Sequence, residues 1–364
     1  MPLPWVKYHS GVEVEQPGEK ETIDQIVASM RRTNGHVFDK RRHAVRDAHA
    51  KSHGILKGRL SVHPPFYKEL AQGIFQPGRE YPVVARLSSS HGDVHSDEVR
   101  SLKGLAVKVI GVEGRKLLSG REDEVTQDFL FVNLPVLPFG DVATYLEMQR
   151  KEEGRILNNE PPPGFIGEIA STASTALKSL GLTSGSLDVV GPPAHHILGE
   201  TFHSMAAIRF GAYVAKLSVA PLSPSVSELA GRAVDIDGNS SRYRDLVVQF
   251  FRTNAAEYEI RAQLCTDLER MPVEDASVVW DPELSPHLPV ARLIFEPQDA
   301  YSPARRVYGD EVLSFNPWHC IEEHRPLGSV MRARIAAYEA STRFRHAMNG
   351  QPSVEPRDIA EIPD

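Results

Sequence analysis

The sequence predicts an α+β fold in which one β-rich domain, built on an antiparallel sheet or barrel, carries added helices. Two observations predict it. Short β-rich segments separated by Gly, Pro or charged turns fill residues 55–135 and return between 205 and 297. Segments with helical spacing of apolar residues are few, and they precede, interrupt and follow these blocks. The 364 residues allow one or two domains, and a single domain over 1–364 is the simplest account.

Local composition predicts the individual elements. Residues 1–20 are polar and contain Pro and Gly, so we expect an extended arm there, and we expect a loose tail at 351–364. The Pro-rich and small-residue stretch at 161–200 predicts a loop and a helix. Apolar spacing predicts helices at 22–32, 142–151, 242–252 and 331–345. Strands are expected at 55–62, 81–89, 104–112, 127–136, 205–211, 212–221, 258–266 and 290–297.

Composition narrows the class of protein. A net charge of −7 argues against a general nucleic-acid or anionic-membrane surface, because both need a basic excess. Cys265 and Cys320 are far apart without metal-type spacing, so we expect free thiols in a reducing compartment. The N-terminus has no apolar stretch that resembles a signal sequence, and no run of about 18 apolar residues follows. We therefore expect a cytoplasmic protein.

The C-terminal helical segment carries a stripe of polar side chains. At about 100° per residue, Arg334, Tyr338, Ser341 and Arg345 fall within about 60° of one face. A tyrosine phenol has a pKa of about 10 in model peptides, so a phenolate near neutral pH needs cations or a metal to stabilise it. Arg334 lies one turn before Tyr338 and could donate to the phenolate oxygen. The stripe suits a ferric haem, with phenolate on iron and guanidinium on a propionate; the alternative is an amphipathic helix with a solvated charged face.

Three other segments carry candidate site residues. His49 leaves a turn for a strand and could act as a general base, although most of the 15 histidines should be structural or exposed. Alternation places Arg86 and Ser88 on one strand face, opposite Leu87, where the arginine needs an anion and the hydroxyl can bond an imidazole. The alternative is an edge strand with one exposed face. Asn133 ends an apolar strand and could donate to a reactive oxygen, although Asn-x-Pro is most often turn chemistry.

Together and in this order, these segments resemble the haem-binding core of the catalase superfamily. RDAHAKSHGILKGRLSV is similar to the segment with the distal histidine, and VARLSSSHGD followed by VRSLKGLAVKVIGVEG resembles two strands of the family. VNLPVLPFGD resembles the segment with the distal asparagine, and RARIAAYEASTRFR resembles the proximal helix. The resemblance covers about residues 40–150 and 205–350. HRPLGSVMRARIAAYEAS looks especially like the small catalase-related haem proteins.

The resemblance implies a fold and a role for each matched residue. The fold would be a catalase-like antiparallel β-barrel with surrounding helices and a C-terminal haem-ligating helix. Tyr338 would ligate the iron with Arg334 holding it anionic, and His49 would be the distal base, oriented by Ser88 and aided by Asn133. The other residues expected to contact the cofactor are Arg46, Arg86 and Arg345 at the propionates, Tyr145 stacked on the porphyrin, and Ser341.

The resemblance also implies an activity. We expect an oxidoreductase with a b-type haem (iron protoporphyrin) that decomposes or reduces hydrogen peroxide or organic hydroperoxides, as a catalase or peroxidase of the oxidative stress response. Its partner would be a small-molecule peroxide, with no nucleic acid or membrane, in a homo-oligomer. Two alternatives remain open. One is a haem-dependent rearrangement of fatty-acid hydroperoxides, as in allene oxide synthases, and the other is a haem-binding protein without catalysis.

The sequence departs from the family pattern on the distal side. Without gaps, Val132 falls on the distal asparagine, so Asn133 takes that role only with a shift of one residue. Ala48 stands where the family has a valine, and Leu137 and Pro138 stand where it has phenylalanines. Smaller side chains predict a different, roomier distal pocket.

Overall fold

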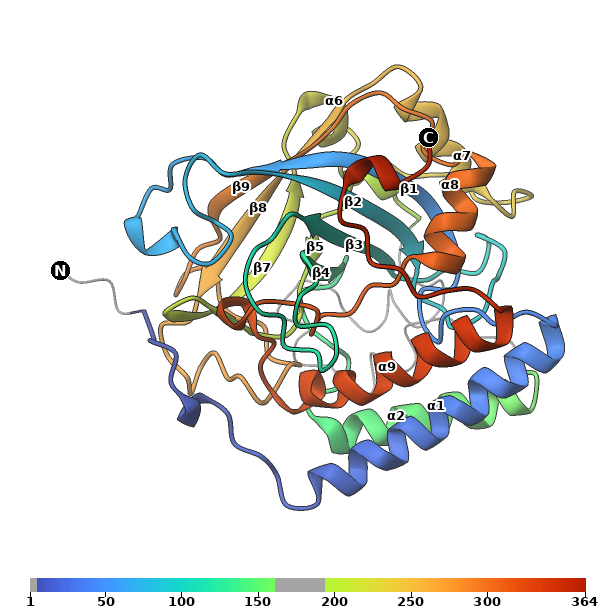
Figure 1. The fold of residues 1–364 in the computed structure, drawn as a ribbon, viewed down its shortest axis with the longest axis horizontal. Helices are drawn as coiled ribbons and strands as arrows, with labels where there is room; N and C mark the ends of the chain where they lie inside the picture. The colour runs from blue at the N-terminus through green and yellow to red at the C-terminus, as the bar shows by residue number, and fades with distance from the viewer. Residues whose placement is uncertain (1–4, 161–193) are drawn as a thin grey trace.

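A closed antiparallel β-barrel forms the centre of the molecule. The structure is a computed structural model that describes residues 5–160 and 194–364. Nine strands of these residues form one sheet in the order β5-β4-β3-β2-β1-β9-β8-β7-β6. Because β5 pairs with both β4 and β7, the sheet closes on itself, and β6 pairs with β7 beside this ring. The expected antiparallel barrel with added helices is confirmed (Figure 1).

Most of the strands and helices lie close to the segments that composition predicts. The strands are β1 (Ser52–Ser61), β2 (Glu80–Ser89), β3 (Lys103–Ile110), β4 (Thr126–Val132), β5 (Phe202–His203), β6 (Ile208–Phe210), β7 (Tyr213–Pro221), β8 (Ala256–Leu264) and β9 (Leu288–Phe295). The helices are α1 (Glu19–Arg41), α2 (Val142–Leu157), α6 (Pro224–Ser227), α7 (Arg242–Phe251), α8 (Pro303–Val307) and α9 (Ser329–Asn349). The short elements β5, α6 and α8 were not predicted, and neither was the π-helical turn, Tyr308–Val312, that follows α8.

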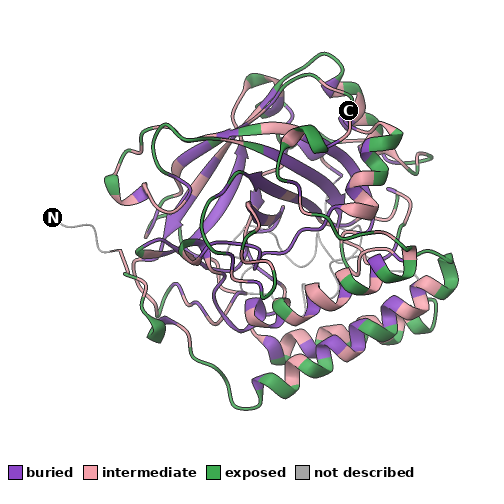
Figure 2. Ribbon diagram, viewed as in Figure 1, coloured by how far each residue is buried: buried purple, intermediate pink, exposed green. Residues whose placement is uncertain are grey.

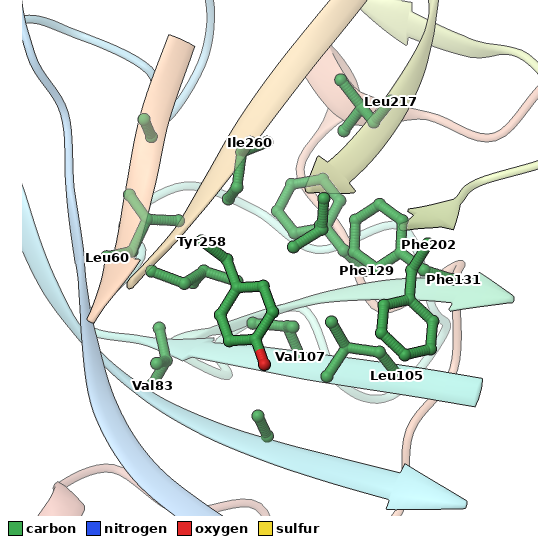
Figure 3. Packing of buried hydrophobic residues seen from close by; sticks show 14 of the residues in the cluster. Leu60, Val83, Leu105, Val107, Phe129, Phe131, Phe202, Leu217, Tyr258 and Ile260 are labelled. Atoms are coloured by element: carbon green, nitrogen blue, oxygen red, sulfur yellow. The ribbon is translucent and has the colours of Figure 1, made fainter. Parts of the chain in front are cut away.

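Apolar side chains fill the barrel interior. Figure 3 shows alternate residues of neighbouring strands meeting there, among them Leu105, Val107, Phe129 and Phe131. Because successive side chains of a strand point to opposite faces, the residues between them face outward from the barrel. The same alternation puts Leu87 into this core, which leaves its two neighbours on the outer face. The outer face of β2–β4 is therefore available for a site.

Three helices cover this outer face. In Figure 1, α9 runs below the barrel and α1 and α2 lie beneath it, and Figure 2 shows exposed residues along the outward sides of these helices. Ile26 and Met30 of α1 pack with Leu146 of α2 and with Ala333 and Ala337 of α9. The small alanines allow the three helices to approach closely, so α9 is held between the barrel and the other two.

Some expected boundaries were wrong. The first helix continues to Arg41 although the residues beyond 32 lack a strong apolar period; Phe38 there packs edge to face on Phe344 of α9. The strand expected over 127–136 ends at Val132, and Pro135, which has no N–H, follows soon after. Of the arm, residues 1–4 lie outside the described residues, as do residues 161–193 of the loop and helix expected at 161–200.

The C-terminal segment is packed rather than loose. Ile362 is 1% exposed and lies in a cluster with Ile55 and Leu313. The Glu355 carboxylate accepts a hydrogen bond from the buried ammonium of Lys108 at 2.7 Å. Two isoleucines, Ile359 and Ile362, among mostly polar residues and prolines give no periodic signal, so composition could not predict this docking.

Candidate functional site

The predicted site residues converge on one pocket between the outer face of β2–β4 and helix α9. The pocket encloses about 960 Å³ of space, part of which is open to solvent. Apolar groups from the barrel, such as Leu130 and Val132, form one wall, and Tyr338 of α9 lies among the residues of the other. Every predicted site residue except Asn133 lines it, namely Arg46, His49, Arg86, Ser88, Tyr145, Arg334, Tyr338, Ser341 and Arg345.

His49 is held in a strained and closely defined position. Its backbone has φ 57°, in the left-handed region that residues other than glycine rarely adopt. The Nδ1 atom lies 3.0 Å from the Ser88 hydroxyl, so the expected contact between them is present. Gly104 of β3 makes room for the ring, because a Cβ there would lie 2.5 Å from ring atoms of His49. These contacts leave Nε2 as the ring nitrogen available for proton transfer.

The environment of His49 favours the neutral imidazole. Burial, reinforced by the positive charges of Arg86 and Arg334, lowers the pKa of His49 to about 3. The ring is therefore neutral near pH 7 and able to accept a proton.

Tyr338 and Arg334 meet on the opposite wall. The guanidinium carbon of Arg334 lies 5.7 Å from the centre of the Tyr338 ring. The expected hydrogen bond from Arg334 to the phenol oxygen is not among the contacts of the described residues; instead Arg334 Nη1 donates to Met331 Sδ at 3.6 Å. Burial raises the pKa of Tyr338, the charge of Arg334 opposes that shift, and Asp47 adds to it. A phenolate at this position therefore needs a further cation at its oxygen.

A surplus of positive charge gathers at one end of the pocket. Arg86 Nη2 donates to Asp310 Oδ1 at 3.0 Å, and Arg46 Nη1 lies 3.7 Å from the same oxygen. Arg345 Nη1 donates to the carbonyls of Asp310 and Glu311 at 2.8 and 2.6 Å. Burial and the charges of the other two arginines lower the pKa of Arg46 well below its usual range. Among the described residues, Asp310 supplies the carboxylate that contacts these guanidiniums and Glu311 adds a second negative charge nearby, so three positive charges face two negative ones and the site favours anions.

Two further predicted residues lie on the pocket wall. The Tyr145 ring stacks on Phe139, with ring centres 4.4 Å apart and planes inclined by 6°. Ser341 Oγ donates to Asp47 Oδ1 at 2.7 Å, which joins helix α9 to the segment that carries His49. Burial raises the pKa of Asp47, opposed by this hydrogen bond.

Asn133 does not line the pocket, so the structure gives no support to its prediction as the distal amide. Its side-chain oxygen accepts a hydrogen bond from the backbone N–H of Lys103 at 2.7 Å. Val132 lines the pocket in its place. Strand alternation is the physical reason, because a shift of one residue reverses the face on which a side chain lies. The gap-free match of Val132 to the distal asparagine was therefore the better guide.

A second cluster of possible metal ligands lies away from the pocket. Glu124, His319 and Glu355 could place three ligand atoms within 4.8 Å of one another. The ammonium of Lys108 already binds Glu355 at 2.7 Å, and His319 Nε2 lies 2.8 Å from Glu124. Hydrogen bonds to carboxylates raise the pKa of His319 against the effect of burial. This cluster is a buried ion-pair network that holds the C-terminal segment.

Comparison with known proteins identifies the fold. No protein-family model matches the sequence, and no curated protein matches it. A bacterial catalase superposes with a TM-score of 0.62 and 15% identity, over 88% of this chain and 62% of that chain. A fungal catalase gives 0.58 and 16% over 85% and 61%, and catalase A from Saccharomyces cerevisiae gives 0.57 and 16% over 86% and 64%. The chain has a catalase-like fold.

The likeness has defined limits. The chain spans less than two thirds of the length of each of these catalases. Identities of 15–16% show a shared catalase-like fold and leave the activity to be argued from the site.

Cys265 and Cys320 are both buried free thiols, as expected. In the described residues, no helix combines the length and apolar character needed to cross a bilayer.

The structure adds three residues to this pocket that sequence reasoning missed. Asp310 lies in the π-helical turn, far along the chain from the arginines that it contacts, and no local pattern marks it. Asp47 lies two positions before His49, in the segment RDAHAKSHG, where an acidic residue so close to a candidate base was a usable signal. Gly104 sits in a strand interior, where a glycine often indicates the close approach of another group.

Proposed function

We propose that this protein is a haem-dependent oxidoreductase that decomposes or reduces hydrogen peroxide and organic hydroperoxides. The supporting observation is that His49 and Tyr338, far apart in sequence, line one pocket with three arginines gathered at its end. One fold can host many functions, so the function is argued from the residues of this pocket and not from the catalase-like fold alone.

The residues present fit a haem. Apolar side chains and Tyr145 offer surfaces to a flat macrocycle, and the surplus of guanidinium charge at Arg46, Arg86 and Arg345 offers anion sites for two propionates. Tyr338 would hold the iron through its phenol oxygen, which a ferric ion would stabilise as phenolate although burial raises the pKa of this group. When bound, the haem would supply an iron centre that accepts two oxidising equivalents from a peroxide.

The chain's own residues would carry the proton. Neutral His49 accepts the peroxide proton at Nε2 while Ser88 holds Nδ1, and it returns the proton to the leaving oxygen. The rest of the distal wall is apolar at Val132 and small at Ala48, with no amide from Asn133. This wall favours organic hydroperoxides, whose alkyl groups gain from apolar contact. The same observation supports rearrangement of a fatty-acid hydroperoxide as a second candidate function.

Spectroscopy and a peroxide assay test the proposal. The purified protein should show a Soret band and consume cumene hydroperoxide with a reducing donor. His49→Ala should keep the band and lose most of the turnover, on the order of a hundredfold or more. His9→Ala, on the exposed N-terminal segment, is the matched control.

The remaining outcomes separate the alternatives. A fatty-acid hydroperoxide converted without any donor would favour rearrangement. A Soret band without turnover, unaffected by His49→Ala, would leave haem binding alone. A protein that takes up no haem would overturn the proposal.

A further inference from the structure

We propose that Met331 is an oxidation site through which peroxide changes the position of Arg334 beside Tyr338, the proposed iron ligand. This rests on the proposed function for the role of Tyr338 and for the presence of peroxide. Oxidation of the Met331 thioether would draw Arg334 away from the phenol ring. The site would thereby respond to excess peroxide.

The first observation is an unusual partner for a cation. Arg334 Nη1 donates to the Met331 thioether sulfur at 3.6 Å, while its guanidinium carbon lies 5.7 Å from the centre of the Tyr338 ring. A thioether is a weak acceptor, so this contact leaves Arg334 weakly held. Met331 itself is 4% exposed and is fixed by its carbonyl, which accepts from Trp318 Nε1 at 2.5 Å.

The second observation is a cavity that reaches the sulfur-bearing side chain. A small cavity is lined by Met331, Arg334 and His324 and shares the Arg334 wall with the main pocket. It has room for a water-sized molecule. His324 is 1% exposed, and its Nε2 accepts a hydrogen bond from the backbone N–H of Ile74 at 3.1 Å. Hydrogen peroxide is close to water in size and polarity, so a cavity of this size can admit it beside Met331.

The chemistry needs no further reagent. The Met331 sulfur attacks one oxygen of the peroxide, the O–O bond breaks, and a sulfoxide S–O bond forms. The sulfur loses two electrons and the peroxide gains them. The leaving oxygen takes the remaining proton as water from hydrogen peroxide, or as an alcohol from an organic hydroperoxide.

The sulfoxide would hold Arg334 more strongly than the thioether does. A sulfoxide oxygen is a polar acceptor, so it binds a guanidinium N–H far better than a thioether does. Arg334 would then turn toward residue 331 and away from the Tyr338 ring. Because Arg334 opposes the effect of burial on the phenol, its withdrawal would alter the iron ligand and the haem spectrum.

Peptide mass spectrometry of the full-length protein tests the oxidation step. Met271 is the matched control: it is 0% exposed, and its sulfur also accepts hydrogen bonds, from Thr266 N and Oγ at 3.4 Å. It lines neither cavity and packs instead with Trp280 and Leu327. After mild hydrogen peroxide treatment that leaves the circular dichroism unchanged, Met331 sulfoxide should accumulate several-fold faster than Met271 sulfoxide. Equal or slower oxidation of Met331 would overturn the proposal.

Two variants test the coupling to Arg334. Met331→Leu removes the oxidisable sulfur, and Met331→Gln supplies an amide oxygen as a stable mimic of the sulfoxide. Peroxide pretreatment should shift the haem spectrum of the wild type toward that of Met331→Gln and should leave Met331→Leu unshifted. An equal shift in Met331→Leu would refute the coupling. A wild type without any Soret band would count against the proposed function, while the mass spectrometry would still decide whether Met331 is the oxidation site.

Discussion

The substitution Gly104→Ala tests whether the position of His49 limits the chemistry. A Cβ at this position would lie 2.5 Å from the His49 ring and 3.0 Å from Ser88 Oγ, whereas ordinary contact begins at 3.4 Å. The ring must therefore retreat by about 0.9 Å into the pocket, which has space for it. Misplacing a reacting group by about 1 Å can cost on the order of a hundredfold in rate.

Stability should change little, which makes the variant informative. Alanine reduces the entropy of the unfolded chain and adds about 0.4–1 kcal/mol of stability where the backbone tolerates it, which offsets part of the strain. Haem uptake, urea unfolding and peroxide turnover should be measured together, with a crystal structure to locate the ring. Gly35→Ala in α1, which meets no atom within 4 Å, is the control. Full turnover in a folded, haem-loaded Gly104→Ala protein would refute the reasoning.

Three further predictions follow from single contacts. Asn133→Ala should cost about 1 kcal/mol in urea unfolding, through the lost bond to Lys103 N, with an unchanged haem spectrum; a spectral change would restore the residue to the site. Arg46→Leu should weaken haem uptake more than uptake of haem dimethyl ester, measured by titration; equal losses would contradict the assignment of propionates to the arginines. Burial lowers the pKa of His324 to about 3, so the native state keeps it neutral while the unfolded chain gains a proton below its ordinary value near 6.5. The free energy of unfolding should therefore fall as pH drops from about 6.5 toward 3, and this group should account for about 2 kcal/mol of the loss at pH 5. In urea unfolding, His324→Gln should make the free energy of unfolding depend less on pH. An unchanged pH dependence would contradict this role of His324.

Periodic patterns in the sequence were sufficient for the local structure. Alternation in β2 placed Arg86 and Ser88 opposite Leu87, and the structure confirms that Leu87 enters the core while the other two line the pocket. The spacing of Tyr338 and Arg345 likewise put both on the pocket side of α9. These predictions succeed because a strand repeats every two residues and a helix every 3.6, whatever surrounds them.

Register at the strand end was beyond that reasoning. Whether Val132 or Asn133 faces the pocket depends on the pairing of β4 with β3, in which Val132 lies opposite Gly104. Both residues fit the local composition, so only the pairing could choose between them.

The sequence by itself determined which residues could share a face, and it carried the four ordered segments that resemble a haem-binding core. The tertiary structure decided which faces meet. It closed the barrel through β5, brought Asp310 to the arginines, joined Asp47 to Ser341, and left Arg334 between Tyr338 and a methionine sulfur. These contacts join segments separated by many residues or depend on how a side chain packs, so they follow from burial of the whole chain rather than from the period of any one element.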